Sequence, residues 1–253
     1  MQYVRLDVAL FGWLLKSLFG KAPATVEEQL ATRWAHTFTL QDDPTVVWPS
    51  LSVDVGLMNT TEKRYVGCLA DSLDLDVADG GPLGATWGIL GRPYTAAAFG
   101  SAVARGTQDF LTHSHITTIE LDDVALLPGL RLLSLSINNN MEEAFEHSSR
   151  NIARGEFGEL EITGELGYRY TNQTQLDTFL AETARKLEVF FTGGALGNAS
   201  YALNITLGKI RFTGTPQMNQ QEQVIHTIPF KAYKPTSGNF VDIVLKNAVS
   251  TYA

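Results

Sequence analysis

The 253-residue chain contains a single cysteine, Cys68, so it has neither an internal disulfide nor a zinc site built from cysteines. It is also short of positive charge, because 19 Lys and Arg stand against 27 Asp and Glu, a formal net charge of −8. This balance opposes tight binding to nucleic-acid phosphates, which requires clustered basic side chains. No run of about 18 uncharged apolar residues is present, so the sequence predicts no transmembrane helix.

Motifs of catalysis are absent as well. The chain has no GxSxG, no HExxH and no phosphate-binding loop, because residues 80–84 are not followed by Gly-Lys-Ser/Thr. The best metal candidates are His113 and His115, whose imidazoles would point the same way on a strand. Nearby acidic residues are Glu120, Asp122 and Asp123. No third ligand has a motif-like spacing, so we predict no enzyme activity, no catalytic residue, no cofactor and no bound metal.

What the chain does contain is alternation of apolar and polar residues, the pattern of half-buried strands. Residues 133–137 alternate strictly, and residues 160–170 place apolar side chains on one face. Gly164 interrupts the second pattern and indicates a bulge or the close approach of another backbone. The period then lengthens to about 3.6, which predicts an amphipathic helix over residues 173–187.

The N-terminal segment predicts a second helix. Leu10, Leu14 and Leu18 share one side, and Gly20 is placed to end the helix. A secretory signal is disfavoured, because Asp7 precedes the apolar stretch and Lys16 follows it closely.

Strand patterns fill most of the remaining chain. We expect about ten strands, which include residues 34–40, 51–55, 64–77, 114–121, 201–207, 209–213, 221–233 and 240–245, the last with loose ends. Residues 83–106, rich in Gly and Ala, have no clear assignment and are consistent with a loop that becomes ordered against a neighbouring subunit. The pattern predicts a mainly β fold with short flanking helices.

The chain also shows a weak internal repeat. Residues 51–55 are echoed by residues 133–137, and each strand is followed by a polar turn, a Gly and a long alternating strand. The copies lie about 80 to 88 residues apart, which is the size of a domain and too long for a solenoid repeat. The repeat predicts two tandem β-sandwich or barrel domains, residues 1–110 and 111–253.

The order of these segments resembles a known family. It comprises GWLLKSLFG at residues 12–20, HTFTL at 36–40, PSLSV at 49–53, YVGCLADSLDL at 65–75, LSINN at 135–139 and HTIPFKA at 226–232. This arrangement is similar to that of the major tail tube proteins of long-tailed, non-contractile (siphovirus-type) bacteriophages, over residues 10–233.

The resemblance implies a structural virion protein without enzymatic activity. Its subunits would form stacked rings around a hollow tube, through which genomic DNA passes without specific binding. Two tube domains per chain would favour a homotrimeric pseudo-hexamer over a hexamer. Implied partners are the tape measure protein and the tail terminator and tip proteins, with no membrane contact and with assembly in the cytoplasm of the bacterial host.

Physical features of the chain agree with assembly. Strands 64–77 and 156–170 exceed the usual five or six residues, so they are long enough to continue a sheet into a neighbour. Acidic strand faces at Asp74, Asp76 and residues 159–165 suit either solvent or a lumen that repels DNA. The predicted contact loops are residues 59–63, 80–106, 138–149 and 217–223.

One alternative stays open: a β-sandwich that binds carbohydrate or a receptor on a virion or cell surface. It requires exposed aromatic side chains that line a cleft. The candidates are Trp34, Trp48 and Trp87.

Overall fold

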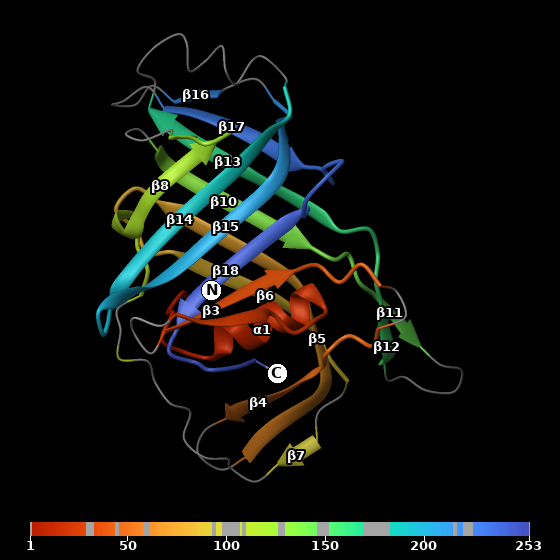
Figure 1. The fold of residues 1–253 in the computed structure, drawn as a ribbon. Coiled ribbons are helices and arrows are strands. Elements are labelled where there is room, and N and C mark those ends of the chain that lie inside the picture. The colour runs from red at the N-terminus through yellow and green to blue at the C-terminus, as the bar shows by residue number, and fades with distance from the viewer. Residues whose placement is uncertain are drawn as a thin grey trace.

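The computed structural model is mainly β, which confirms the predicted fold class (Figure 1). It describes residues 2–28, 33–43, 46–57, 61–92, 95–97, 107, 110–125, 130–145, 152–169, 183–214, 217–219 and 225–252. Within these residues lie one α-helix, α1 (Leu10–Phe19), a short 3-10 helix, η1 (His113–His115), and 18 strands.

Most of the strands form two antiparallel layers. Layer A contains β1 (Gln2–Tyr3), β6 (Gly84–Leu90), β5 (Thr61–Ala78), β10 (Leu130–Asn138), β13 (Glu161–Arg169), β17 (Ile225–Ala232) and β16 (Gln217–Asn219). Layer B contains β9 (Val124–Ala125), β8 (Ile116–Leu121), β14 (Arg185–Leu196), β15 (Ala199–Phe212), β18 (Val241–Asn247), β3 (Arg33–Thr39) and β2 (Ala24–Glu28). Strand β15 belongs to both layers, because its middle pairs with β14 and β18 while residues 210–212 pair with β17.

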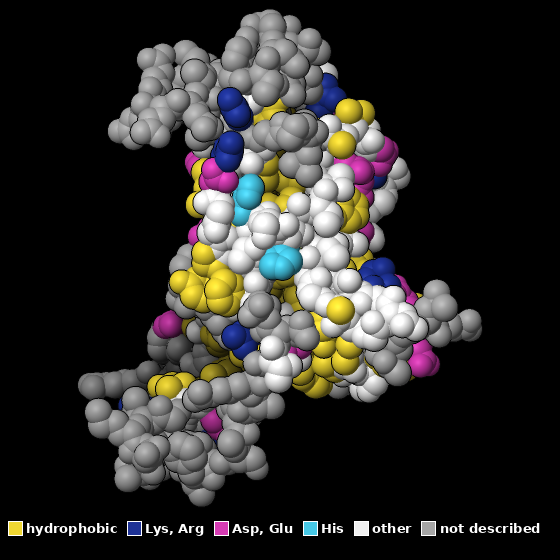
Figure 2. All heavy atoms as spheres, turned by 90° about the vertical axis from the view of Figure 1, so that its left-hand side faces the viewer, with side chains coloured by type: hydrophobic (Ala, Val, Ile, Leu, Met, Phe, Trp, Pro, Cys, Tyr) yellow, Lys and Arg dark blue, Asp and Glu magenta, His cyan; other side chains and the backbone are white. Residues whose placement is uncertain are grey.

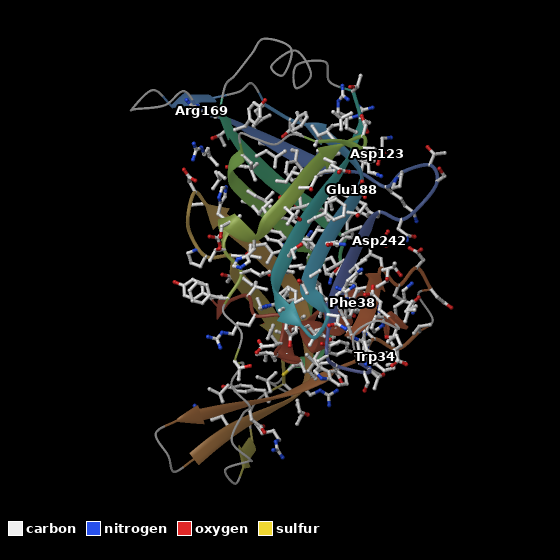
Figure 3. The ribbon with its side chains drawn as sticks, turned by 60° about the vertical axis from the view of Figure 1, so that its left-hand side comes forward. Trp34, Phe38, Asp123, Arg169, Glu188 and Asp242 are labelled. Carbon is white, nitrogen blue, oxygen red and sulfur yellow. The ribbon has the colours of Figure 1, made fainter. Side chains whose placement is uncertain are left out.

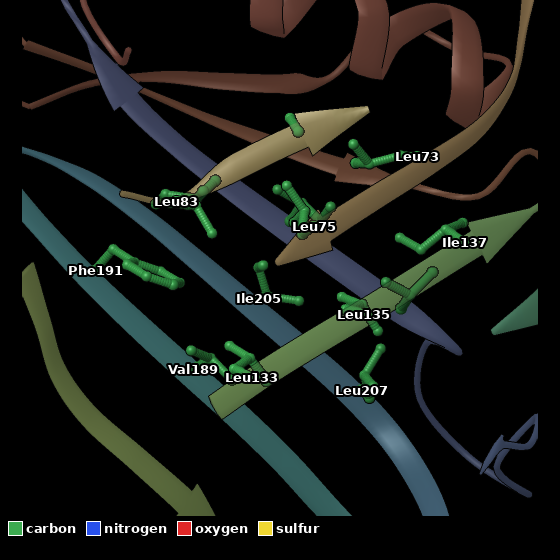
Figure 4. Close-up of a cluster of buried hydrophobic side chains, with 14 of the residues drawn as sticks. Leu73, Leu75, Leu83, Leu133, Leu135, Ile137, Val189, Phe191, Ile205 and Leu207 are labelled. Atoms are coloured by element: carbon green, nitrogen blue, oxygen red, sulfur yellow. The ribbon is translucent and has the colours of Figure 1, made fainter. Parts of the chain in front are cut away.

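The hydrophobic core lies between the two layers (Figure 4). Every second residue of the central strands points inward, and these side chains are at most 5% exposed. The labelled members from layer A include Leu75, Leu133 and Leu135, and those from layer B include Val189, Phe191, Ile205 and Leu207. Burial of each such side chain contributes roughly 1.5–3 kcal/mol, so the alternation in the sequence drives the layers together.

Helix α1 packs beside the layers and agrees with its prediction. Leu14 and Leu18 are buried against the core, whereas Leu10 at the start of the helix is exposed. Gly20 ends the helix in the left-handed conformation, with φ 78°, and its N–H donates to the carbonyl oxygen of Lys16 at 3.1 Å. A residue with a Cβ would be strained there, which is the reason that glycine marks this helix end.

The two halves of the chain build one sandwich, which corrects the predicted division at residues 110 and 111. Strand β5 pairs with β10, and β3 pairs with β18, so each of the two layers contains strands from both halves. The supposed repeats are not equivalent either, because residues 51–57 form β4, outside the two layers, while residues 130–138 form the central strand β10. Alternation marks any half-buried strand, so similar patterns do not by themselves indicate duplicated domains.

Other local predictions also need correction. The predicted helix at 173–187 falls mainly on residues outside the described ones, and its last residues, from Arg185, belong to strand β14. Within residues 83–106, the described parts include β6 and the short strand β7 (Thr95–Ala97). The strand predicted from residue 114 begins at Ile116, because η1 precedes it.

Strand β5 is 18 residues long and extends beyond layer A, in agreement with its prediction. Its first half pairs with β4 (Leu51–Leu57) on one side and with β7 on the other. We call this three-stranded unit, made of β4, β7 and residues 61–68, the arm; it projects at the lower end of Figures 1 and 3. Gly67, with φ 65°, lies close to where β5 leaves the sandwich. A separate hairpin, β11 (Glu142–Phe145) with β12 (Ile152–Glu156), extends from the side.

Candidate functional site

The two candidate metal ligands do not converge. His113 and His115 lie in η1 rather than on a strand, so their side chains do not share one face. The Nε2 atom of His113 bonds the carbonyl oxygen of Leu130 at 3.1 Å. The Nδ1 atom of His115 accepts the N–H of Thr112 at 3.0 Å, as part of a capping box. Both imidazoles therefore have structural partners.

The fold instead brings three other acidic side chains close together. The carboxylates of Glu120, Asp123 and Glu188 lie within 4.8 Å of one another. The Nζ atom of Lys186 lies 2.8 Å from a carboxylate oxygen of both Asp123 and Glu188, so an ammonium group already bridges two of the three carboxylates. That ammonium lowers the pKa of Asp123. The arrangement is an ion-pair network at the edge of layer B (Figure 3).

Cys68 is fully buried, and burial raises the pKa of its thiol above the ordinary value. A thiol that stays protonated and inaccessible is a poor nucleophile. Figure 2 shows one face of the molecule, on which charged side chains of both signs are scattered without a basic patch. Among the described residues, no helix is long and apolar enough to cross a membrane.

The outer face of layer A gathers acidic and small polar side chains. Strand β10 lies between β5 and β13, so Asp76, Ser134 and Glu165 form one row across three strands. The next row contains Asp74, Ser136 and Thr163. The hydroxyl of Ser136 donates to Asp74 at 2.5 Å, and the N–H of Glu165 donates to the hydroxyl of Ser134 at 3.1 Å. The acidic faces that the sequence placed on separate strands are thus parts of one surface, which contains a groove of about 600 Å³.

The arm has two unlike faces. Directly opposite residues of antiparallel strands share a face, so Val53 and Tyr65 lie together, as do Val55, Lys63 and Ala96. The other face carries a bidentate ion pair, in which Arg64 donates to both oxygens of Asp54 at 2.7 and 2.8 Å. We call the face with Val53 and Val55 the apolar arm face. On this face Val53, Lys63 and Tyr65 are half-buried and Val55 is exposed, whereas Asp54, Arg64 and Val66 on the other face are all exposed.

A cleft of about 280 Å³ opens near the base of the arm. Trp48 and Phe157 line it, with ring centroids 3.9 Å apart, and Trp48 packs against Gly20, where a Cβ would lie only 2.5 Å from the indole. Trp48 is the candidate aromatic that lines this cleft. Trp87 packs edge-on against Phe11, with centroids 5.6 Å apart. Other lining residues are Leu40, Gln41, Asp42, Asn139, Gly158, Leu160, Lys234, Gly238, Asn239 and Phe240. We call this the Trp48 cleft.

A chain of hydrogen bonds, which runs from the surface into the interior, holds the segment after β18 in place. The hydroxyl of Thr25 donates to Nδ1 of His36 at 2.9 Å, and Nε2–H of His36 donates to the carbonyl oxygen of Val249 at 2.8 Å. The N–H of Val249 donates to Asn247 at 3.0 Å, and Asn247 donates to the hydroxyl of Tyr252 at 2.8 Å. Tyr252 is 0% exposed, so the prediction of a loose end after the last strand was wrong.

This network predicts a loss of stability in mild acid. Burial lowers the pKa of His36 below the ordinary value near 6.5. The unfolded chain therefore binds more protons than the folded chain as the pH falls through that value, and the free energy of unfolding falls with it. Urea unfolding between about pH 7.5 and pH 5.5 measures this slope. His36→Gln should flatten it, while His113→Gln should not; an unchanged slope in His36→Gln would contradict the assignment.

The predicted contact loops are distributed over several elements. Within residues 59–63 the described part belongs to the arm, and residues 80–106 include β6 and β7. Residues 138–149 lead from β10 into β11, and residues 217–219 form β16. The Trp48 cleft was missed, because its lining comes from four segments that are far apart in the sequence, at residues 40–48, 139, 157–160 and 234–240.

The fold and these surfaces define a class of protein: a β-sandwich with a projecting arm and no assembled catalytic centre among the described residues. The sequence profile of the family described as phage tail tube protein matches residues 4–232. The chain therefore belongs to the phage tail tube protein family, as its sequence pattern predicted. Membership makes it a structural component of a virion tail and implies oligomeric assembly with other tail proteins. A search of curated protein sequences gives no significant match.

Proposed function

We propose that copies of this chain assemble into rings that stack into a hollow tube, through which the phage genome passes to the host. The family match over residues 4–232 carries this proposal. The arm supports it, because a sheet that projects from the sandwich presents strand edges and exposed apolar residues such as Val55 and Val66 to another subunit. The long strand β5, of 18 residues, gives the arm its reach.

The ring would contain six chains rather than three. The trimeric pseudo-hexamer depended on two tube domains per chain, and the two halves of this chain instead share one core. Heterologous contacts between identical copies close into such rings when each copy is rotated by the same angle.

The outer face of layer A would line the lumen. Its rows carry Asp74, Asp76 and Glu165 among serines and threonines, so it presents short, hydrated and mostly anionic side chains. A lumen of this kind repels duplex DNA and prevents it from adhering. Glu161 of β13 forms an ion pair with Lys231 of the neighbouring strand β17 at 2.5 Å, and this pair adds no net charge.

The remaining parts of the proposal follow from the tail tube resemblance. The tube would surround the tape measure protein and end at the terminator and tip proteins. It would belong to a long, non-contractile tail and assemble in the cytoplasm of the bacterial host.

Electron microscopy of the purified protein over a concentration series, with light scattering on the same samples, tests the assembly. We expect stacked rings with a central channel and sixfold symmetry. A protein that stays monomeric at all concentrations, even with the other tail proteins present, would contradict the proposal. Threefold rings would instead favour the ring of three chains.

A further inference from the structure

The Trp48 cleft has the size of a site for one small molecule. Its volume of about 280 Å³ lies near the lower end of the range for ligand pockets, which is roughly 300–1,000 Å³. All of the lining residues described above belong to one chain. The site is therefore complete in a single subunit and does not depend on the assembly of a ring.

One wall of the cleft is aromatic and already fixed. The indole of Trp48 packs against Gly20, where a Cβ would lie 2.5 Å from it. The ring of Phe157 stacks on Trp48, with centroids 3.9 Å apart and planes inclined by 34°, and Phe157 remains 40% exposed. An exposed ring that a second ring holds in place offers an electron-rich face, which attracts the slightly positive C–H groups of a ligand.

A buried amide forms part of the opposite wall. Asn139 is only 4% exposed, and its Nδ2 atom donates to the carbonyl oxygen of Leu18 at 3.0 Å. No described residue donates to the Oδ1 atom of Asn139. Because buried acceptors are normally satisfied, this oxygen is left to the solvent of the cleft or to a ligand that occupies it.

Two further amides line the cleft with unused hydrogen-bonding groups. Gln41 accepts the N–H of Asp43 on its Oε1 atom at 3.2 Å, so its Nε2 donors have no partner among the described residues. Asn239 donates to Asp242 at 2.9 Å, which leaves its own Oδ1 atom as an acceptor. The lining therefore presents both donors and acceptors near the aromatic wall.

The lining carries no net charge. Its charged members among the described residues are Asp42 and Lys234, which are 82% and 73% exposed and lie 3.8 Å apart, so each balances the other. A charged ligand would find no unbalanced opposite charge there. The lining thus suits a neutral ligand that carries hydroxyl groups, which both donate and accept, beside an apolar C–H face. A pyranose sugar combines these properties.

We propose that the Trp48 cleft binds a neutral pyranose sugar. A C–H face of the sugar stacks on the ring of Phe157, and its hydroxyl groups bond to the Oδ1 atom of Asn139 and the Nε2 atom of Gln41. This binding goes beyond the tube function and does not rest on it, because one subunit supplies the whole site. A free sugar and the terminal unit of a polysaccharide share this chemistry.

NMR titration of the ¹⁵N-labelled monomeric protein tests the site. The neutral probes are methyl glycosides of glucose, galactose and mannose, and the comparison ligands are glucuronic acid, glucosamine and adenosine. We expect saturable shifts, in the millimolar range, of the Trp48 indole N–H and of the side-chain amides of Asn139 and Gln41. The Trp48 signal is identified by its loss in Trp48→Phe. Oligosaccharides of the same sugars distinguish the two sources, because tighter binding to them identifies a chain end as the ligand.

Substitutions locate the binding in the cleft. Phe157→Ala removes the stacking face and should weaken binding of the best glycoside at least about fivefold. Gln41→Ala removes one set of donors and should weaken it about threefold, independently of the ring. Tyr3→Ala is the matched control and should leave binding unchanged, because Tyr3 is also an exposed ring, at 51%, that packs on a second ring, Phe110, at 5.3 Å.

Three results would overturn the sugar site. The first is a titration in which no glycoside moves the signals of Trp48, Asn139 and Gln41. The second is wild-type affinity in both Phe157→Ala and Gln41→Ala. The third is tighter binding of glucuronic acid, glucosamine or adenosine than of every neutral glycoside. None of them would affect the tube proposal, which electron microscopy of the assembled protein tests without any sugar.

Discussion

Tyr252→Ala should lower the free energy of unfolding by about 3–5 kcal/mol, the range for removing a large aromatic side chain from a core. The ring of Tyr252 is fully buried. It lies edge-on to His36, with centroids 4.7 Å apart, and to Trp13, at 5.6 Å. The ring also occupies the space beside Gly12 that any Cβ there would fill. The substitution therefore opens a cavity between α1 and β3 and removes the partner of Asn247.

Urea unfolding of the monomeric protein gives the stability change directly. Tyr252→Phe separates the contributions of the ring and the hydroxyl, because it keeps the packing and loses only the hydrogen bond from Asn247; we expect a cost of about 1–2 kcal/mol. Tyr233→Ala is the surface control and should change the stability by less than about 0.5 kcal/mol. A small effect of Tyr252→Ala, equal to that of Tyr233→Ala, would show that the segment after β18 does not hold α1 in place. Burial raises the pKa of Tyr252 to about 12, so its hydroxyl stays protonated throughout these measurements.

Gly164→Val should be at least as disruptive as the loss of Tyr252, because it overfills the core. Gly164 lies on β13 between Leu135 of β10 and Phe230 of β17. A Cβ at this position would collide with the carbonyl oxygen of Ser134 and would lie 2.5 Å from the ring of Phe230. The backbone at Ser134 cannot move aside without breaking the hydrogen bonds between β10 and β13. We therefore expect the free energy of unfolding to fall by about 3 kcal/mol or more, and soluble expression to be poor.

Thermal unfolding by circular dichroism measures this effect. Thr163→Val is the control from the same strand, because Thr163 points to the outer face, where extra methyl groups meet no neighbour in the core. Gly164→Ala should fall between the two. If Gly164→Val melts at the wild-type temperature, the close packing of Phe230 over this glycine is not required for the fold.

Local structure was largely predictable from the sequence. The strict alternation at residues 133–137 and the stripe that ends at Gly20 depend on neighbours within a few positions, and strand β10 and helix α1 confirm them. Of the two alternatives predicted for Gly164, the structure confirms the close approach of another backbone, and the register runs through this position without a bulge. The long strand β5, which forms part of the arm, was also predictable, because the alternation of apolar and polar residues continues past the usual strand length.

Which strands pair with one another could not be predicted in this way. The sequence pattern of β4 resembles that of β10, yet β4 lies in the arm and β10 lies at the centre of layer A. The same limit explains the erroneous division into two domains, since alternation specifies which face is buried and not which strand lies beside it. Strand partners follow from the closure of the whole sheet through β15.

The same distinction between local pattern and strand pairing applies to the candidate surfaces. Sequence alone determined that the chain is acidic, mainly β and without a catalytic motif, because composition and periodicity can be read without knowing which residues meet in space. The resemblance to tail tube proteins came separately, from the order of its sequence segments. Only the tertiary structure brought Trp48 to Phe157, joined Asp76 to Glu165 across Ser134, and buried Tyr252 beside Gly12. These contacts join residues far apart along the chain, and what selects them is the burial of one shared core, to which both halves of the sequence contribute.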